Sequence, residues 1–268
     1  MLLGCVGLSK NSHQGRQNRF QVSVAHRLNR NNSVLQDACS VKLPFLSTDS
    51  CFFCLCEGHR NGLEVSQTVS SLLHEFLLKE IQARHSSFGM KSCFENAYKR
   101  MDEYLGDTAR DRGTTVAAIM IRRHANSMRI YVSNVGRPQA ILCRASNAIR
   151  ITKQHTQTED EEHCRLAACP AYTQTSPRIR QLVLSSRALG DHLFKDWVIS
   201  TPHYAEFELN QHDSDVVVMT SNICEVLSDE EVLQIVRGFS IPPVSFFFFG
   251  SYIKISSLLI HFYTGHSP

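Results

Sequence analysis

The order of apolar and polar residues divides the chain into segments with the period of a strand and segments with the period of a helix. Residues 51–56 are apolar without interruption, which is typical of a strand buried on both faces. Apolar residues that alternate with polar ones predict an earlier strand at residues 20–25, and residues 37–41 predict another. Residues 63–83 carry their apolar side chains on one helical face and predict a long helix.

Three capping-box patterns, each a Ser or Thr followed three residues later by Glu, predict the starts of further helices. They begin at Ser92, Thr158 and Ser228, and Gly106 is predicted to end the first of these helices. Runs of β-branched and aromatic residues predict strands at residues 114–121, 128–134, 139–143, 148–151, 182–184, 197–199, 207–209 and 215–220. Two helices, a meander of strands and a final helix indicate an α+β fold with antiparallel sheets.

The composition is that of an ordinary globular chain, with 268 residues, 43% of them hydrophobic and 20% charged. A net charge of +3, with no cluster of Lys or Arg, argues against a nucleic-acid partner. The ten cysteines lack the spacing of a disulfide framework. They are typical of reduced thiols in a cytoplasmic protein, with a nuclear location as the alternative.

The character of the sequence changes near both ends. We interpret residues 1–14 as an N-terminal tail, residues 15–239 as the folded domain and residues 240–268 as an atypical hydrophobic C-terminal tail. Residues 244–263 approach the length of a membrane span, but Lys254 and several serines interrupt them. The sequence therefore favours an exposed apolar tail over a membrane anchor.

Seven short motifs follow one another in the order of a known family. They are Gln36-Asp37-Ala38, residues 53–59, residues 113–117, residues 131–136, residues 151–155, residues 186–191 and residues 225–231. As a set they resemble the metal-dependent protein phosphatases of type 2C (the PPM family), over residues 15–239. The resemblance implies a four-layer α-β-β-α sandwich of two antiparallel sheets flanked by helices, here lacking its last strands.

Within that family, residues 57–61 and 134–144 most resemble the PH-domain leucine-rich-repeat protein phosphatases. The sequence contains neither a leucine-rich array nor a PH domain. The resemblance to this branch therefore covers the phosphatase domain alone.

Family members hold two magnesium or manganese ions and hydrolyse phosphoserine or phosphothreonine, and such hard dications need clustered oxygen ligands. The resemblance implies that Asp37, Glu57 and the Gly58 carbonyl are metal ligands, and that His59 is the general acid for the leaving alkoxide. The residues alone leave another interpretation open, in which Asp37 ends a surface loop and residues 57–59 form a polar strand end.

Several positions depart from the family pattern. Arg137 stands where the family usually has an acid, and its positive charge opposes the binding of a dication. Asn222 replaces an expected Asp and offers only a neutral carbonyl. The family's final Gly-x-x-Asp-Asn motif is missing, and its phosphate-binding arginine is replaced by another residue, so that Arg16 or Arg30 becomes the candidate phosphate contact.

Three other groups have a structural interpretation beside the functional one. We interpret Asp191 mainly as structural, with a ligand role as the alternative, and Arg187 as either a buried ion pair or a phosphate contact. The spacing of Cys51, Cys54 and Cys56 is compatible with a zinc knuckle. On a strand, however, Cys51 faces away from the other two, which argues against zinc.

Because several acidic ligands are replaced, we expect a catalytically impaired pseudophosphatase with no metal bound. It would act as a binding or regulatory module for a signalling protein or phosphoprotein, without a nucleic-acid partner. An active magnesium- or manganese-dependent serine/threonine phosphatase is the first alternative, favoured by Asp37, Glu57 and His59. The second is a truncated or alternatively spliced fragment with an unpaired sheet edge, favoured by the abrupt tail.

Overall fold

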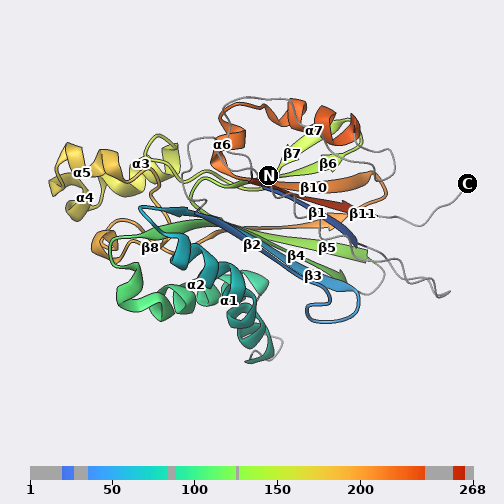
Figure 1. The fold of residues 1–268 in the computed structure, drawn as a ribbon, viewed down its shortest axis with the longest axis horizontal. Helices are drawn as coiled ribbons and strands as arrows, with labels where there is room; N and C mark the ends of the chain where they lie inside the picture. Colours follow the sequence, from blue (N-terminus) through green and yellow to red (C-terminus); the bar gives the residue numbers. More distant parts are fainter. Residues whose placement is uncertain (1–19, 27–35, 84–88, 125–126, 239–255, 263–268) are drawn as a thin grey trace, which may run out of the picture. The chain divides into compact units, whose positions relative to one another are not determined.

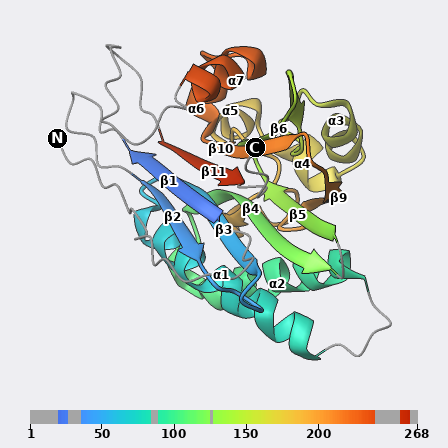
Figure 2. The ribbon, with the colours of Figure 1, turned by 90° about the vertical axis from the view of Figure 1, so that its right-hand side faces the viewer.

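The fold comes from a computed structural model, which describes residues 20–26, 36–83, 89–124, 127–238 and 256–262. These residues form two compact units. One contains the described parts of residues 1–35, 139–151 and 209–268, and the other contains those of residues 36–138 and 152–208. Each unit is built around its own sheet (Figure 1 and Figure 2).

The sheet of the 36–138/152–208 unit has the strand order β2-β3-β4-β5-β9, with β8 paired to β4. Its strands are β2 (Asp37–Lys42), β3 (Ser50–His59), β4 (Gly113–His124), β5 (Ser127–Val135), β8 (Leu189–Gly190) and β9 (His203–Leu209). The fully buried segment 51–56 confirms the predicted central strand. The strand continues to His59, so the motif after Cys56 lies within β3 and not in a loop.

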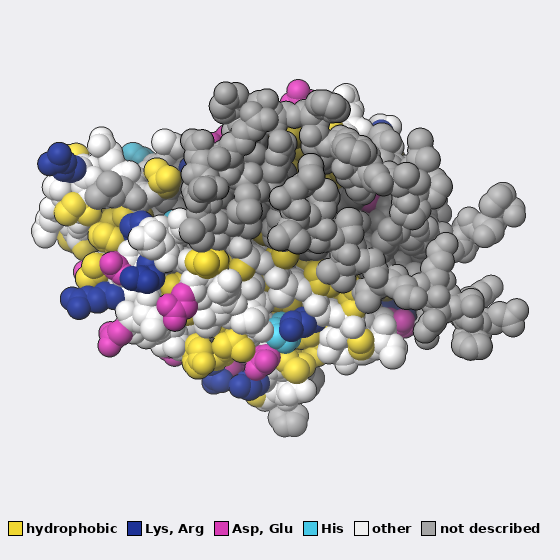
Figure 3. Space-filling view, in the orientation of Figure 1, with side chains coloured by type: hydrophobic (Ala, Val, Ile, Leu, Met, Phe, Trp, Pro, Cys, Tyr) yellow, Lys and Arg dark blue, Asp and Glu magenta, His cyan; other side chains and the backbone are white. Residues whose placement is uncertain are grey.

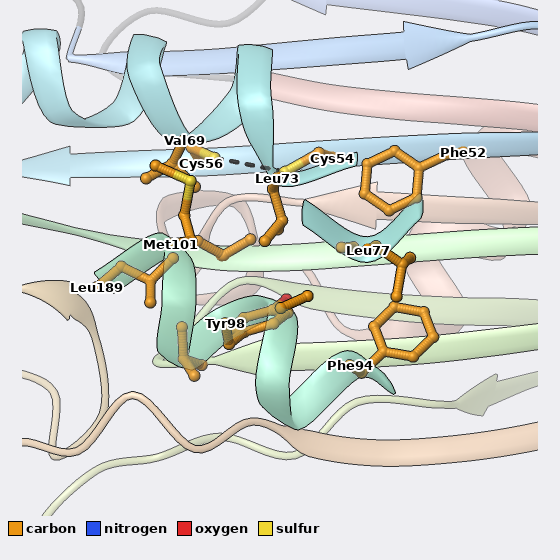
Figure 4. Packing of buried hydrophobic residues seen from close by; sticks show 14 of the residues in the cluster. Phe52, Cys54, Cys56, Val69, Leu73, Leu77, Phe94, Tyr98, Met101 and Leu189 are labelled. Atoms are coloured by element: carbon orange, nitrogen blue, oxygen red, sulfur yellow. Dashed lines mark hydrogen bonds between the residues drawn. The ribbon is translucent and has the colours of Figure 1, made fainter. Parts of the chain in front are cut away.

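Helices α1 (Leu63–Ala83) and α2 (Met90–Leu105) cover one face of this sheet (Figure 1). Leu73 of α1 and Phe94 and Tyr98 of α2 belong to one buried cluster with Phe52 of β3 (Figure 4). Full burial of one large apolar side chain contributes about 1.5–3 kcal/mol. The predicted amphipathic helix at residues 63–83 is confirmed, because its apolar stripe is the side that packs on the sheet.

The three cysteines of β3 pack as core residues. Cys54 and Cys56 lie in the cluster under α1 and α2, with their Sγ atoms 3.5 Å apart (Figure 4). Burial raises the pKa of the Cys51 and Cys56 thiols, which opposes the thiolate form that binds zinc. These observations agree with the structural interpretation of the cysteines.

Helices α3 (Asp160–Ala167), α4 (Pro170–Gln174) and α5 (Pro177–Leu182) lie between β7 and β8 in the sequence, and residues of α3 and α4 pack in a cluster with Trp197. The predicted strands at residues 182–184 and 197–199 are wrong. Leu182 ends α5, and Ile199 makes only an isolated bridge with Arg187. Both apolar runs are too short for their period to separate strand from helix, and the proline at the start of α5 favours a helix.

The other unit has a sheet with the strand order β1-β11-β10-β6-β7. Its elements are β1 (Phe20–His26), β6 (Gln139–Arg144), β7 (Asn147–Arg150), β10 (Asp213–Met219), α6 (Ser221–Cys224), α7 (Asp229–Gly238) and β11 (Ser256–Phe262). Val232 and Leu233 of α7 pack on Ile141 and Val217 of the sheet. The predicted strands at residues 20–25, 139–143, 148–151 and 215–220 are all present.

The β11 strand comes from the segment that the sequence predicts to be a tail outside the domain. It lies between β1 and β10 and pairs antiparallel with both, with Val216 opposite Ile260 and Val22 opposite Ile260 on the other side. The segment predicted to be a tail thus contributes a strand to this sheet, which continues beyond β10 in the described residues. Apolar residues of strand length in the tail supply the missing pairing partner.

The predicted capping boxes have different outcomes. The first two are wrong, because α2 starts at Met90 and α3 at Asp160 without a side-chain cap at either N-terminus. The third is confirmed: the Ser228 N–H donates to Glu231 Oε2 at 2.8 Å, and the Glu231 N–H donates to Ser228 Oγ at 3.2 Å. Gly106 follows the last residue of α2, as predicted, with φ of 52°.

Replacing the cap of α7 tests this assignment. We expect Ser228→Ala to lower the free energy of unfolding by about 1 kcal/mol, because one N–H of the first turn loses its acceptor. Urea denaturation measures the change. Ser92→Ala is the matched control, since Ser92 lies inside α2 and the change is expected to be neutral there. Equal effects of the two substitutions would contradict the assignment.

No helix in the described ranges is both long and apolar enough to cross a membrane. On the face shown in Figure 3, Lys and Arg side chains are interspersed with Asp and Glu side chains over the described residues.

Candidate metal and phosphate site

Strand register brings two of the predicted metal ligands together. Asp37 of β2 lies directly opposite Glu57 of β3, and Glu57 lies opposite Thr115 of β4. Residues directly opposite each other in antiparallel strands project to the same face. The Thr115 hydroxyl donates to Glu57 Oε2 at 3.3 Å. Asp37, Glu57 and Thr115 thus form a row across three strands, on the face opposite to the one where Cys56 packs under the helices.

Gly58 lies where the backbone is most crowded. Its N–H donates to the Gln36 carbonyl at 3.1 Å, and the Gln36 side chain accepts from the Gly62 N–H at 2.9 Å. A Cβ on Gly58 would lie 2.4 Å from the Gln36 carbonyl oxygen and 2.8 Å from that of Gly62. The glycine therefore lets β2 and the start of α1 approach β3 next to the two carboxylates.

His59 is hydrogen-bonded to a buried carboxylate. His59 pairs with Gly113, and Gly113 pairs with Gly190, which places Asp191 within reach of the imidazole. The His59 Nε2 to Asp191 Oδ2 distance is 2.8 Å, and Arg60 donates to the other carboxylate oxygen. Asp191 is only 1% exposed.

The charge of Asp191 is stabilised by these partners. Burial opposes its ionised form, but the hydrogen bond and charge of His59, together with Arg60, outweigh that effect and lower the pKa of the carboxyl. These contacts agree with a structural role for Asp191. The role of His59 as a general acid stays a prediction. In this structure its Nε2 atom is hydrogen-bonded to Asp191.

Arg137 follows directly after the turn that contacts Thr115. Gly136 has φ of 87°, and a Cβ there would lie 2.1 Å from Thr115 Cγ2. Arg137 is half-buried and directly follows Gly136. Gly136 contacts Thr115, whose hydroxyl bonds Glu57. A guanidinium at a position where the family has an acid opposes the accumulation of positive charge from dications.

The remaining predicted site residues either belong to the other unit or fall outside the described residues. Asn222 is in α6, directly after β10, in the unit that does not contain Asp37 and Glu57. Arg16 and Arg30 fall outside the described residues. The roles of these three residues stay predictions.

Arg187 takes part in a buried ion-pair network. Its Nε donates to Glu162 Oε1 at 2.9 Å, and Arg165 donates to Glu162 Oε2 at 2.7 Å. The Ser186 hydroxyl donates to the same Oε2 at 2.6 Å. Burial favours the neutral acid, but these donors outweigh it and lower the pKa of Glu162 to about 2. Of the two interpretations of Arg187, the buried ion pair is the one with observed contacts.

The donor set can be tested against the two-ion centre that the resemblance implies. In the described part of the chain, no group of three or more His, Cys, Asp or Glu side chains is arranged to hold a metal ion. Asp37 and Glu57 supply two carboxylates, and Asp191 is engaged by His59 and Arg60. Two hard dications need more anionic oxygens than this set offers. The described residues therefore do not fit a two-metal centre.

Comparison with protein-family models identifies the chain. The protein phosphatase 2C model matches residues 12–240. The chain belongs to the protein phosphatase 2C family. Nothing in this match distinguishes an active member from an inactive one, or one branch of the protein phosphatase 2C family from another.

Curated relatives support the family assignment. The chain is 29% identical over 195 residues to probable protein phosphatase 2C 45 of Oryza sativa subsp. japonica, covering 69% of this chain and 65% of the relative. It is 26% identical over 186 residues to probable protein phosphatase 2C 14 of Arabidopsis thaliana, covering 68% and 40%. The chain thus spans between 40% and 65% of the length of these two relatives.

Solved structures share the fold. A Toxoplasma gondii serine-threonine phosphatase 2C superposes with a TM-score of 0.72 at 13% identity, covering 97% of this chain and 98% of that one. A Caenorhabditis elegans sex determining protein superposes with a TM-score of 0.75 at 15% identity, covering 94% of this chain and 66% of that one. The predicted α+β class, with two antiparallel sheets and flanking helices, is confirmed.

Sequence reasoning missed two residues that contact the predicted site residues. Thr115 bonds Glu57, and Arg60 bonds Asp191. The Gly-Thr-Thr motif at residues 113–115 was a usable signal for the first, because a hydroxyl near the end of the neighbouring strand can reach a carboxylate. Arg60 had no local signal, since its partner lies 131 residues away.

Proposed function

We propose that this protein phosphatase 2C domain is a pseudophosphatase, which binds a phosphorylated signalling protein without hydrolysing it. The observation that carries the proposal is the donor set at the ends of β2 and β3. Asp37 and Glu57 form one carboxylate pair, and Arg137, one residue after the turn that contacts Thr115, stands where the family usually has an acid. Family chemistry requires two dications, and two carboxylates next to a cation give them too little negative charge.

Manganese titration of hydrolysis of a phosphothreonine peptide tests the proposal. We expect no manganese-dependent turnover in the wild-type protein. We expect the double substitution Arg137→Asp with Asn222→Asp to restore measurable turnover, because it returns two carboxylates to family positions. Adding Glu57→Ala to that variant is expected to abolish the gain again.

A charge-matched control separates this effect from a change in net charge. Arg178→Asp with Asn147→Asp makes the same change of charge at exposed residues of α5 and β7, and it is expected to leave the protein without turnover. Manganese-dependent turnover in the wild-type protein that Glu57→Ala removes would overturn the proposal.

An active serine/threonine phosphatase is the second candidate. Two features favour it because they retain one part of a metal site. Asp37 pairs directly with Glu57, and the backbone around Gly58 packs closely beside them. This candidate predicts manganese binding at millimolar concentration by calorimetry. Absence of a binding isotherm that is sensitive to Glu57→Ala would reject it.

A further inference from the structure

A second polar site lies within the 36–138/152–208 unit, and none of the predicted metal ligands lines it. It is a pocket of about 220 Å³. Its walls come from the start of α2, the segment after β7, α3 and the start of β9. Pockets for drug-sized ligands measure about 300–1,000 Å³, so this one has room for a small group.

Cations converge on the pocket from three segments. Lys91 comes from α2, Lys153 from the segment after β7, and Arg187 from the segment before β8. Arg187 is held in place by Glu162, and its Nη1 donates to the Thr201 carbonyl at 3.0 Å. A guanidinium has five N–H groups, so Arg187 keeps further donors beyond these contacts.

Two histidines complete the donors. The Nδ1 atom of His155 accepts from the Gly136 N–H at 3.1 Å, which leaves Nε2 as the protonated nitrogen and a hydrogen-bond donor. Burial, and then the charges of Lys153 and Arg187, lower the pKa of His203. Burial, and then the charge of Arg187, lower the pKa of His155 to about 3. Burial, with a smaller contribution from neighbouring cations, thus favours the neutral form of both rings.

Carboxylates of the chain itself already contact these cations. Glu95, which also lines the pocket, lies 3.8 Å from Lys91, and Glu162 holds Arg187. Glu161 accepts from Lys153 Nζ at 2.7 Å, although the two side chains are 72% and 52% exposed. An exposed pair of this kind contributes little to stability. Because the pair is weak, a ligand with more charge can displace Glu161 from Lys153.

We propose that this pocket binds the phosphoryl group of a phosphothreonine or phosphoserine side chain, in competition with Glu161. A phosphoryl group carries about −1.5 to −2 charges and three acceptor oxygens, which suits two lysines, an arginine and two imidazole donors. This inference rests on the proposed function as a binding domain, and it places the bound phosphate at a site separate from Asp37 and Glu57.

Fluorescence anisotropy with a degenerate phosphothreonine peptide in EDTA tests the proposal. We expect Lys153→Met to weaken binding by about tenfold or more, because one charge-assisted contact is lost. We expect Glu161→Gln to tighten binding, because the competing carboxylate is removed. Lys99→Met is the matched control, since Lys99 is exposed on α2 and does not line the pocket.

The outcomes separate this proposal from the proposed function. Glu57→Ala is expected to leave peptide binding unchanged. Loss of binding in this variant would place the phosphate at the family site and overturn the proposal that the pocket binds it. Weaker binding in Glu161→Gln, or wild-type binding in Lys153→Met, would also overturn it. Inorganic phosphate that binds as tightly as the peptide would overturn the assignment to a phosphopeptide. Turnover by the wild-type protein would instead reject the proposed function alone.

Discussion

Gly58→Ala is expected to destabilise the unit that contains β3 by about 3 kcal/mol, near the upper end of the usual cost of overpacking. The added methyl group would lie 2.4 Å from one backbone oxygen and 2.8 Å from another. Backbone oxygens cannot rotate away as a flexible side chain can, so β2 or the start of α1 must shift. Urea denaturation followed by circular dichroism measures the loss.

The same shift should separate the carboxylates of Asp37 and Glu57, because the contacted oxygen belongs to Gln36. Gly89→Ala is the matched control. Gly89 precedes α2 with φ of −63°, and a Cβ there meets no atom within 4 Å. We expect this control to unfold within a few tenths of a kcal/mol of the wild-type protein. A Gly58→Ala protein as stable as the control would contradict the close backbone contacts assigned to Gly58.

Glu162→Gln is expected to lower the free energy of unfolding by about 3–5 kcal/mol, the usual cost of removing one partner of a buried ion pair. Glu162 is 2% exposed and accepts from Arg165, Arg187 and the Ser186 hydroxyl. The neutral amide would leave both guanidinium groups without their counter-charge. The adjacent and exposed Glu161→Gln is the control, and we expect it to melt as the wild-type protein does.

The contribution of Glu162 should also depend on pH. Its folded pKa of about 2 lies below the ordinary value for Glu, so its stabilisation is complete above the unfolded pKa. It is lost as the pH falls from about 4.5 towards 2. Acid titration of the melting temperature should therefore show a smaller fall across this window in Glu162→Gln. Parallel acid curves for the two proteins would contradict the assignment.

Local patterns predicted most of the fold because their period reports directly on secondary structure. The apolar stripe of residues 63–83 predicted α1 with its observed bounds, and the continuous run at 51–56 predicted the buried part of β3. Predictions failed where a pattern was short. The run at residues 182–184 and the capping box at Ser92 each had too few residues for the local preference to outweigh packing.

The sequence by itself determined the family, the α+β class and the identity of the residues that depart from the family pattern. Only the tertiary structure decided which residues meet. It placed Asp37 opposite Glu57, paired His59 with Asp191, built the ion-pair network of Glu162, and set β11 between β1 and β10. The physical reason is the distance along the chain. Periodicity is encoded within a few residues, whereas these contacts join segments whose packing depends on the whole sheet.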